Sequence, residues 1–539
     1  MLYPITQTNN LVRLTEYLVP MSDGVRLYTR VAVPAKEGTY PIVFIRTPYE
    51  ESHNGKPHGL SEYEQDQFIQ NNFAVVFQHC RGRGDSEGIC VPHGEIEGSD
   101  GLDTLAFIRS LPFYRGEIFL FGGSYRSTVH LMYLGQKPAD IKGAALSIQT
   151  DRMYFKQYRN GCCYNFCSAG WIAKMLNRQY PDAVLSPDQF VRPYIKISQR
   201  LFGEDVPALT EPFRNDAYND FWRKDPRTNV IDSIDFPVLF VEGWYDFYVP
   251  GMFSMWERLP KKTKEQSAFL VGPWGHATTT ESDGQHPFPN GDIPTDYAVQ
   301  WFRSIRSGDP APFVEKGMVH YYSVGGDVWR TADYPLQSGS RRTFWFGADG
   351  SLLPHPGPAG ECTYTYDPNA VQQEFCGSVI NSSFERVEKS SRNDGILSFY
   401  TTVFKTPAAF FGPIRWHMDV RSDCEDTAFL FRICLSEPDG DFHLTDTITS
   451  LSHIDPAYIP NQKLTLDLET PPIAFTVNQG CRIRVDISSS GGSYVPHANV
   501  RGHWSEVTET KIASNSLICG QDAWIQLPEE QLSGADICP

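Results

Sequence analysis

Short apolar runs alternate with segments of helical spacing through the first 150 residues of the chain. The helical segments lie near residues 61–70, 102–108 and 129–134, and in the last two of them apolar side chains recur every three or four positions. Strands that alternate with helices form a parallel sheet with helices on both faces. The predicted strands are Val12–Pro20 and Val25–Val33 of an initial meander, followed by Ile42–Ile45, Phe73–Phe77, Ile118–Phe121, Ala144–Ile148, Pro237–Val241 and Ala268–Val271.

Two parts of the chain do not follow this alternation. Residues 150–232 are rich in aromatic side chains and have helical spacing, which predicts an insertion above the carboxyl ends of the strands, where ligands bind. From residue 310 onward, short β-rich runs between turn signals predict a jelly roll. Its predicted strands are Val319–Val324, Thr343–Phe346, Thr363–Tyr366, Leu397–Thr401, Thr427–Cys434 and Cys481–Ile487. We therefore expect an α/β domain of residues 1–149 and 233–309, a helical cap at 150–232 and a jelly-roll domain at 310–539.

The length, charge and cysteine pattern of the chain exclude several classes of protein. A length of 539 residues allows two to four domains, and a net charge of −17 argues against nucleic acid or anionic lipid as a partner. No stretch reaches the roughly 20 apolar residues of a membrane span, and the amino terminus does not resemble a signal peptide. We therefore expect a cytoplasmic protein without a membrane partner. The 12 cysteines lack zinc-ligand spacing, so we expect free thiols and no metal site.

The segment 118–127 carries the most informative candidate chemistry. Two glycines follow an apolar strand there, and Ser124 stands between them and the next helix. A serine on such a sharp turn exposes its Oγ, and the N–H groups at the helix start can bind an oxyanion. Serine before a helix is also a common N-cap. By itself, the segment leaves both a hydrolase nucleophile and a structural cap open.

Two later strand ends supply the partners that a hydrolase nucleophile needs. In α/β-hydrolases the acid and then the histidine follow the serine along the chain, each at the end of a later strand. Asp246 follows the strand Pro237–Val241, and His276 follows the strand Ala268–Val271. Both the order and the strand ends therefore predict a Ser124–His276–Asp246 triad, which favours the nucleophile over the cap.

These motifs resemble those of the cocaine-esterase-like hydrolases, a family that includes α-amino-acid ester hydrolases and X-prolyl dipeptidyl peptidases. The resemblance covers nearly the whole chain and implies an α/β-hydrolase fold with a helical cap and a C-terminal jelly roll. It also implies a double displacement through an acyl-serine at Ser124, with no metal or organic cofactor. The similar segments are Arg46–Tyr49, Cys80–Gly88, Asp100–Asp103, Gly122–Tyr125, Gly243–Asp246, Gly272–His276, Gly325–Arg330 and Phe411–Pro413.

An oxyanion hole is expected on two tyrosines. The backbone N–H of Tyr125, directly after the nucleophile, is the first donor. Tyr49 lies just past the end of a predicted strand and is similar to the family tyrosine whose hydroxyl supplies the second donor. A packing role beside Pro48 is the alternative for Tyr49.

The chain departs from the family pattern close to these motifs. Ser127 replaces a glycine three residues after the nucleophile, and we expect a slight shift of the helix against the strand. His79 replaces an aspartate before the x-Arg-Gly run, and we expect a rearranged structural salt bridge. Structural salt bridges are also expected for Arg81 and Arg83.

The acyl pocket is expected to be apolar. Phe247 and Tyr248 follow the catalytic aspartate where amino-acid ester hydrolases carry carboxylates that bind the substrate ammonium. An ammonium buried there without a partner would cost several kcal/mol, so esters of apolar or aromatic acids are favoured. The expected pocket residues are Tyr164, Phe166, Trp171, Phe247, Tyr248 and Phe410.

Two alternatives stay open. The chain could resemble an X-prolyl dipeptidyl peptidase or an α-amino-acyl hydrolase in activity if Asp151 or Asp182 of the insertion reaches the pocket. It could also be a binding protein with a degenerate hydrolase core, against which the complete triad argues. The expected partner of the enzyme is a small-molecule ester or amide, and the sequence does not decide between a monomer and a homo-oligomer.

Overall fold

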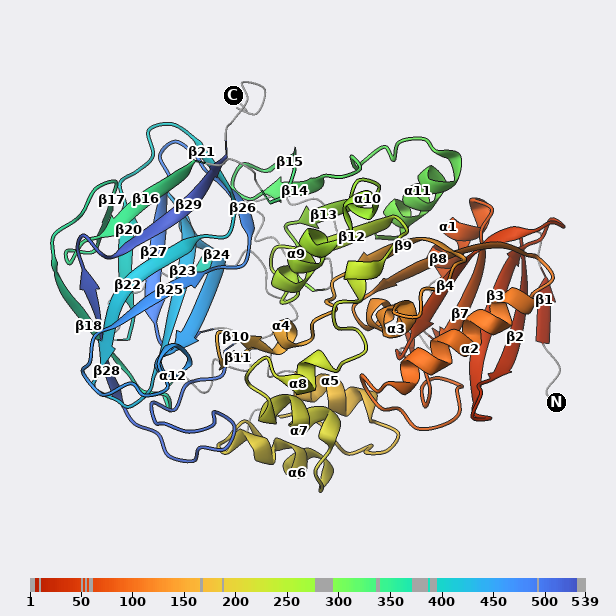
Figure 1. Cartoon of the computed structure of the whole chain (residues 1–539), viewed down its shortest axis with the longest axis horizontal. Helices are drawn as coiled ribbons and strands as arrows, with labels where there is room; N and C mark the ends of the chain where they lie inside the picture. The colour runs from red at the N-terminus through yellow and green to blue at the C-terminus, as the bar shows by residue number, and fades with distance from the viewer. Residues whose placement is uncertain are drawn as a thin grey trace.

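Three parts of the chain lie side by side in the structure: an open sheet with helices, a group of short helices and a β-rich part farthest from the amino terminus (Figure 1). The computed structural model describes residues 5–8, 11–49, 52–53, 56–57, 62–164, 168–186, 189–276, 294–335, 340–370, 386–387, 395–491 and 494–530. None of the helices within these ranges is long and apolar enough to cross a membrane.

The open sheet is built around seven parallel strands, in the order β7-β4-β8-β9-β12-β13-β14 among the described residues. Antiparallel strands extend it at both edges, with β3, β2 and β1 beyond β7, and β15 beyond β14. The strands are β1 (Ile5–Thr8), β2 (Val12–Pro20), β3 (Arg26–Pro34), β4 (Tyr40–Thr47), β7 (Ala74–His79), β8 (Tyr114–Gly123), β9 (Ile141–Ser147), β12 (Val238–Gly243), β13 (Ala268–Gly272), β14 (Val319–Ser323) and β15 (Val328–Ala332).

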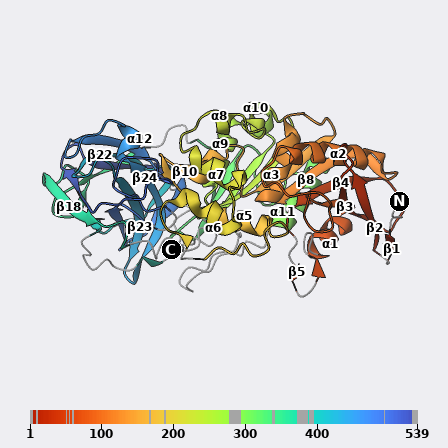
Figure 2. The ribbon, with the colours of Figure 1, turned by 90° about the horizontal axis from the view of Figure 1, so that it is seen from below.

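Helices cover both faces of this sheet, as the sequence predicts. In β4, Ile42 and Phe44 belong to one apolar cluster and Val43 and Ile45 to the other, because successive side chains of a strand point to opposite faces. Figure 2 shows α1 and α11 on the side of the sheet opposite α2 and α3. The helices are α1 (Glu62–Gln70), α2 (Ile96–Ser110), α3 (Tyr125–Leu134), α9 (Val249–Arg258), α10 (Lys261–Lys264) and α11 (Pro294–Ser307).

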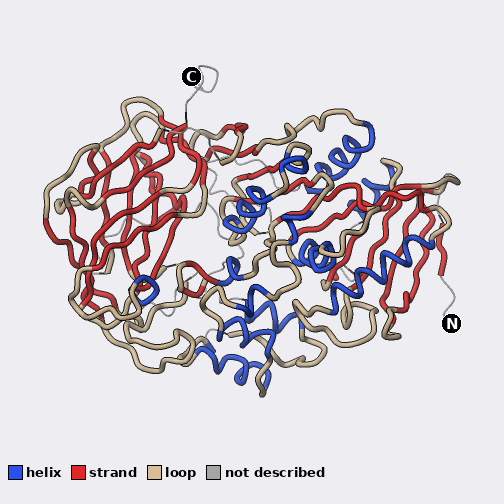
Figure 3. The backbone as a smooth tube through the Cα atoms, viewed as in Figure 1, coloured by secondary structure: helices blue, strands red, loops and turns tan. Residues whose placement is uncertain are grey.

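The cap consists of short helices (Figure 3). They pack through a separate apolar cluster. Contrary to expectation the cap contains a small strand pair, β10 (Tyr158–Arg159) with β11 (Cys162–Cys163). A bridge between Tyr164 and Tyr494 joins the cap to the β-rich part. The cap helices are α4 (Tyr154–Gln157), α5 (Ser168–Met175), α6 (Ile197–Phe202), α7 (Pro207–Arg214) and α8 (Asp220–Arg223).

Among its described residues, the C-terminal part consists of strands and connecting loops apart from the four-residue α12 (Leu451–Ile454), and this confirms the predicted β-rich character. Its core is lined by long apolar strands such as β23, whose pairing with β24 and β27 is antiparallel. The strands are β16 (Arg341–Phe346), β17 (Ser351–Leu353), β18 (Gly360–Tyr366), β19 (Arg386–Val387), β20 (Leu397–Thr401), β21 (Ala408–Gly412), β22 (Arg415–Ser422), β23 (Ala428–Glu437), β24 (Gly440–Ser450), β25 (Leu464–Glu469), β26 (Ile473–Val477), β27 (Arg482–Ser488), β28 (Ala513–Cys519) and β29 (Trp524–Glu530).

The predicted strand Val319–Val324 is found as β14, but not in the jelly roll. It pairs in parallel with β13 and, through β15, completes the edge of the open sheet. The sheet therefore continues past residue 309, where we expected it to end. Sequence periodicity detects a strand but not its neighbour, because pairing depends on contacts between distant parts of the chain. Val324 also bridges to Phe475, so this segment connects the two β structures.

Candidate active site

Ser124 stands on the turn between β8 and α3 in a backbone conformation that non-glycine residues rarely adopt. Its φ is 55° and its ψ is −125°, and its side chain makes no capping hydrogen bond to the helix. A side chain at Gly122 would bring a Cβ within 2.5 Å of the carbonyl of Arg126, so only glycine lets the helix approach this closely. Strain of this kind at a nucleophile position is consistent with an exposed Oγ rather than with an N-cap.

Ser127 attaches the start of α3 to two strands. Its hydroxyl donates a hydrogen bond to the Gly122 carbonyl of β8 and accepts one from the Ser147 N–H of β9, at 3.2 Å. The side chain is fully buried. The serine at the usual glycine position therefore satisfies two backbone groups at the base of the turn.

The parallel register of β12 and β13 brings Asp246 and His276 together. Gly243 at the end of β12 lies opposite Gly272 at the end of β13. Beyond this pair the two turns stay bonded, since the Trp244 N–H donates to the Gly272 carbonyl at 2.9 Å. Asp246 and His276 follow these neighbouring strands after a similar number of residues, so their side chains lie close together.

A chain of hydrogen bonds joins the three residues. The Ser124 Oγ lies 3.0 Å from His276 Nε2, and His276 Nδ1 lies 2.6 Å from Asp246 Oδ2. The other oxygen of Asp246 accepts a hydrogen bond from the Tyr248 N–H at 2.7 Å. Because the ionised carboxylate can only accept, Nδ1 carries its hydrogen and the neutral ring leaves Nε2 free to take a proton from Ser124.

The two expected oxyanion donors flank Ser124. Tyr125 is the first residue of α3, and the first N–H groups of a helix have no partner within it. Tyr49 follows β4 and lines the same cavity as Ser124, with its side chain partly buried against Tyr125. Both positions therefore suit donors to an oxyanion beside Ser124.

A cavity of about 120 Å³ opens in front of Ser124. Phe247 stacks on His276 with ring centroids 4.6 Å apart, and Tyr248 lies 5.8 Å from the same ring. Trp171 of the cap packs 5.1 Å from Tyr125. The full lining is Tyr49, His93, Ser124, Tyr125, Lys156, Ser168, Trp171, Phe247, Tyr248 and His276.

Two of the other aromatic residues that we expected in this cavity lie elsewhere. Phe410 is fully buried in β21 and stacks on Phe475, 5.1 Å away, because its strand pairs with β26 inside the β-rich part. Tyr164 packs on Tyr494 at the junction between the cap and that part. Phe166 lies outside the described residues.

The departure at His79 has a different consequence from the one expected. The imidazole is buried, neither ring nitrogen has a hydrogen-bond partner among the described residues, and Tyr28 stacks on it at 5.3 Å. Burial lowers the pKa of His79 to about 4, so the ring is a neutral packing group and forms no salt bridge. Burial among aromatic neighbours disfavours the charged form of the imidazole, because no partner among the described residues replaces its hydration. The expectation of a salt bridge at His79 was wrong.

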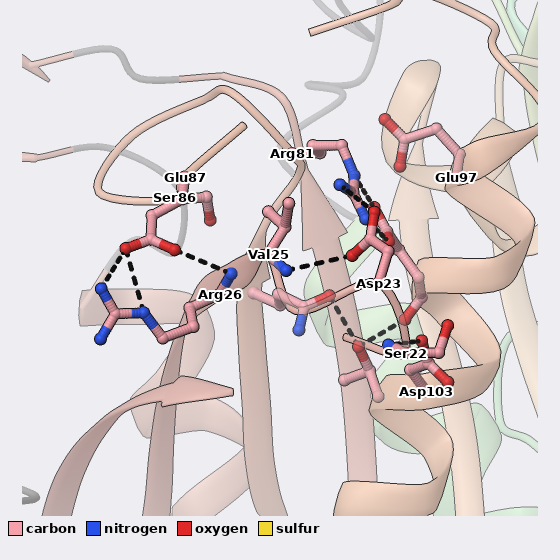
Figure 4. A network of polar contacts seen from close by, with 12 residues as sticks. Ser22, Asp23, Val25, Arg26, Arg81, Ser86, Glu87, Glu97 and Asp103 are labelled. Atoms are coloured by element: carbon pink, nitrogen blue, oxygen red, sulfur yellow. Dashed lines mark hydrogen bonds and ion pairs between the residues drawn. The ribbon is translucent and has the colours of Figure 1, made fainter. Parts of the chain in front are cut away.

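The neighbouring arginines position loops around the site. Arg81 pairs with Asp100 and with Asp23, as expected. Figure 4 shows Arg81 and Asp23 together with the Arg26–Glu87 pair. Arg83 donates to backbone carbonyls, at 2.7 Å to Pro48 and 2.8 Å to Met175. The Pro48 carbonyl directly precedes Tyr49, so Arg83 ties the expected oxyanion loop to the cap.

The carboxylates that we considered as ammonium ligands do not reach the cavity. Asp151 is buried in an ion pair with Arg258, and Asp182 is exposed. Among the described residues that line the cavity there is no aspartate or glutamate, whereas Lys156 is one of them. The charged group that the cap brings to the site is therefore a cation.

Sequence reasoning missed several groups at the site. Lys156, His93 and Ser168 line the cavity, but each stands in a segment without a motif. Glu242 of β12 is fully buried behind the triad, and one of its oxygens accepts the Gly243 N–H at 2.9 Å. Burial, and then the charge of Asp246, raises the pKa of Glu242, which favours the protonated form of this carboxyl.

The sequence of this chain is similar to those of known hydrolases. Residues 23–278 match the X-Pro dipeptidyl-peptidase (S15) family, and residues 313–523 match the C-terminal non-catalytic domain of X-Pro dipeptidyl-peptidases. Cocaine esterase of Rhodococcus sp. (strain MB1 Bresler) is 23% identical over 522 residues, which cover 88% of this chain and 90% of that protein.

Solved structures share the fold over nearly the full length. An α-amino acid ester hydrolase superimposes with a TM-score of 0.80 at 18% identity, covering 97% of both chains. An aminopeptidase from a marine sediment Thaumarchaeota archaeon also gives 0.80, at 17% identity, over 97% of this chain and 96% of its own. These similarities confirm the predicted α/β-hydrolase fold with a C-terminal all-β domain.

Proposed function

Because this chain belongs to the serine hydrolase family of cocaine esterase and the S15 X-Pro dipeptidyl-peptidases, we propose that it cleaves carboxylic esters through an acyl-enzyme on Ser124. The hydrogen-bond chain from Ser124 through His276 to Asp246 carries the proposal. The partner histidine and the strained backbone of Ser124 both support a nucleophilic role.

The proposed reaction uses two displacements. His276 Nε2 takes the Ser124 proton as Oγ attacks the ester carbonyl, and Asp246 stabilises the resulting imidazolium. The Tyr125 N–H and the Tyr49 hydroxyl bind the developing oxyanion. His276 then protonates the leaving alcohol, and water, activated by the same nitrogen, releases the acid from Ser124.

Removing the Tyr49 hydroxyl tests the oxyanion hole. Loss of one such donor typically lowers kcat by about 100- to 1,000-fold, so we expect Tyr49→Phe to lower kcat by about two orders of magnitude with a smaller change in KM. Steady-state kinetics with a p-nitrophenyl ester measure both constants. A near-normal kcat would remove Tyr49 from the oxyanion hole.

The acyl group that we propose is apolar or aromatic rather than α-amino. Phe247, Tyr248 and Trp171 form apolar walls of the catalytic cavity. Lys156, which also lines it, would repel an ammonium group. This charge favours esters without an α-amino group. The two solved structures described above are instead named as an aminopeptidase and an α-amino acid ester hydrolase.

A pair of substrates tests the acyl preference. We expect an aromatic acyl ester to have a higher kcat/KM than its α-amino analogue by at least about tenfold, because an unpaired buried ammonium costs several kcal/mol. The comparison uses the same alcohol in both esters, so that leaving-group chemistry is constant. A strong preference for the charged ester would support the aminopeptidase-like alternative instead.

A further inference from the structure

Lys156 stands where the catalytic cavity meets a second, larger cavity. It belongs to α4 in the cap, and its ammonium lies 5.3 Å from the centroid of the Trp171 ring. The second cavity has a volume of about 470 Å³, and Lys156, His93 and Ser168 line both. A substrate on Ser124 that extends into the larger cavity must therefore pass these three side chains.

The charge of Lys156 has no counterion among the described residues. No carboxylate there lies within ion-pair distance of its ammonium, although Glu95, Glu211 and Asp225 line the larger cavity. Asp225 is already paired with Arg227, whose own charge acts on Lys156. Burial, and then the charge of Arg227, lowers the pKa of Lys156 to about 7.

His93 presents a second unused donor beside Lys156. Arg227 donates a hydrogen bond of 2.9 Å to His93 Nδ1, so in the neutral ring the hydrogen is on Nε2. Burial, followed by the charges of Lys156 and Arg227, lowers the pKa of His93 well below its usual value, which keeps the ring neutral. His93 Nε2 is buried and has no hydrogen-bond partner among the described residues. The ring also stacks on Trp171, with centroids 5.3 Å apart, so its position is held.

We propose that Lys156 and His93 bind a carboxylate of the substrate, so that the preferred esters carry a second, free carboxylate in addition to the ester group. This inference rests on the proposed ester hydrolysis at Ser124. A carboxylate supplies the counterion that Lys156 lacks and an acceptor for the His93 N–H, and both hydrogen bonds would form away from bulk water. Trp171 and Tyr125, whose ring centroids are 5.1 Å apart, line the catalytic cavity together with Lys156, His93 and Ser124.

Matched esters test the proposal and show which part of the substrate carries the carboxylate. One series compares p-nitrophenyl benzoate with p-nitrophenyl 4-carboxybenzoate, in which the free carboxylate is in the acyl part. A second series compares benzoate esters of a neutral alcohol and of its carboxylate-bearing analogue. In at least one series we expect wild-type kcat/KM to favour the anionic member by roughly 10- to 100-fold, the value of a hydrogen bond to a charged group.

Variants assign that preference to Lys156. Lys156→Met should remove it, and Lys156→Glu should reverse it by repelling the carboxylate. Lys224→Met is the matched control, because Lys224 is exposed on the larger cavity and does not line the catalytic one. This control should keep the wild-type ratio between anionic and neutral esters.

The wild-type protein provides a test that needs no variant. Both esters react with the same free enzyme, so the ratio of kcat/KM for the anionic over the neutral ester cancels every pH effect that the two substrates share. As the pH rises past about 7, Lys156 loses its proton and the ratio should fall. Despite its burial, the ion pair with Asp225 raises the pKa of Arg227, so Arg227 keeps its charge and does not produce this change.

The outcomes separate this inference from the proposed function. If the neutral esters are hydrolysed through Ser124 but neither series favours the anion, the proposed carboxylate site is wrong, whereas the proposed ester hydrolysis is retained. A preference for the anionic ester that remains in Lys156→Met, or that does not change with pH, also contradicts the carboxylate site. If neither member of either series is hydrolysed, the proposed function itself fails.

Discussion

Replacement of Ser124 by alanine is expected to reduce ester hydrolysis by roughly six orders of magnitude in kcat, the loss typical of removing a triad nucleophile. Without the Oγ there is no acyl-enzyme, and His276 has no proton to take at 3.0 Å. Turnover of a p-nitrophenyl ester measures the loss. Labelling by a fluorophosphonate probe provides a second measurement, since only an activated serine reacts, and Ser124→Ala should not be labelled.

A matched control separates loss of the nucleophile from damage to the cavity. Ser168 is a second serine that lines the catalytic cavity, at the start of α5, and it does not bond to His276 in the structure. We expect Ser168→Ala to keep labelling and to retain kcat within about tenfold. Circular dichroism and thermal unfolding of both variants check the fold. Undiminished turnover by Ser124→Ala would show that hydrolysis does not use this serine.

The second large effect is expected at Asp246. Its Oδ1 accepts the Tyr248 N–H, so an asparagine would keep its oxygen there and turn its amide NH₂ toward His276. The ring nitrogen Nδ1 would then have to accept, and the hydrogen would move to Nε2, where it blocks proton transfer from Ser124. We expect Asp246→Asn to lower kcat by about 10,000-fold, the typical effect of this tautomer change.

Glu242→Gln is the matched control for Asp246→Asn. Both changes replace a buried carboxyl by an amide on the same segment, but burial and the charge of Asp246 raise the pKa of Glu242, which favours its uncharged form. We expect kcat of Glu242→Gln to stay within about tenfold of wild type. Equal losses in the two variants would indicate damage to the β12 turn rather than loss of the histidine's partner.

Much of the open sheet could be predicted from the sequence because its strands are buried on both faces and flanked by helices. Such strands are continuous apolar runs, and their ends are marked by glycines, as at Gly122 and Gly272. The pairing of β14 with β13 was not predictable in this way. A strand next to a domain boundary has the same sequence pattern whichever sheet it joins.

The candidate nucleophile, histidine and acid could be predicted because each lies next to a strand end within a short motif. In a parallel sheet the carboxyl ends of neighbouring strands meet at one edge, so the order of the strands largely determines which loops approach each other. The aromatic pocket was harder to predict. Phe247 and Tyr248 are close to Asp246 in the sequence and line the cavity. Phe410 is also aromatic, but it is buried in β21.

By itself, the sequence determined the fold class and the candidate triad of Ser124, His276 and Asp246, because strand ends and glycine turns are local patterns. Only the tertiary structure decided which charges face the substrate cavity. Lys156 and His93 are 63 residues apart in the chain and reach the same cavity because the cap folds over the sheet. Asp151, in the same insertion, is turned away into an ion pair with Arg258. Which charged side chains face the cavity depends on packing between segments that are distant in the chain, and no local sequence pattern records that packing.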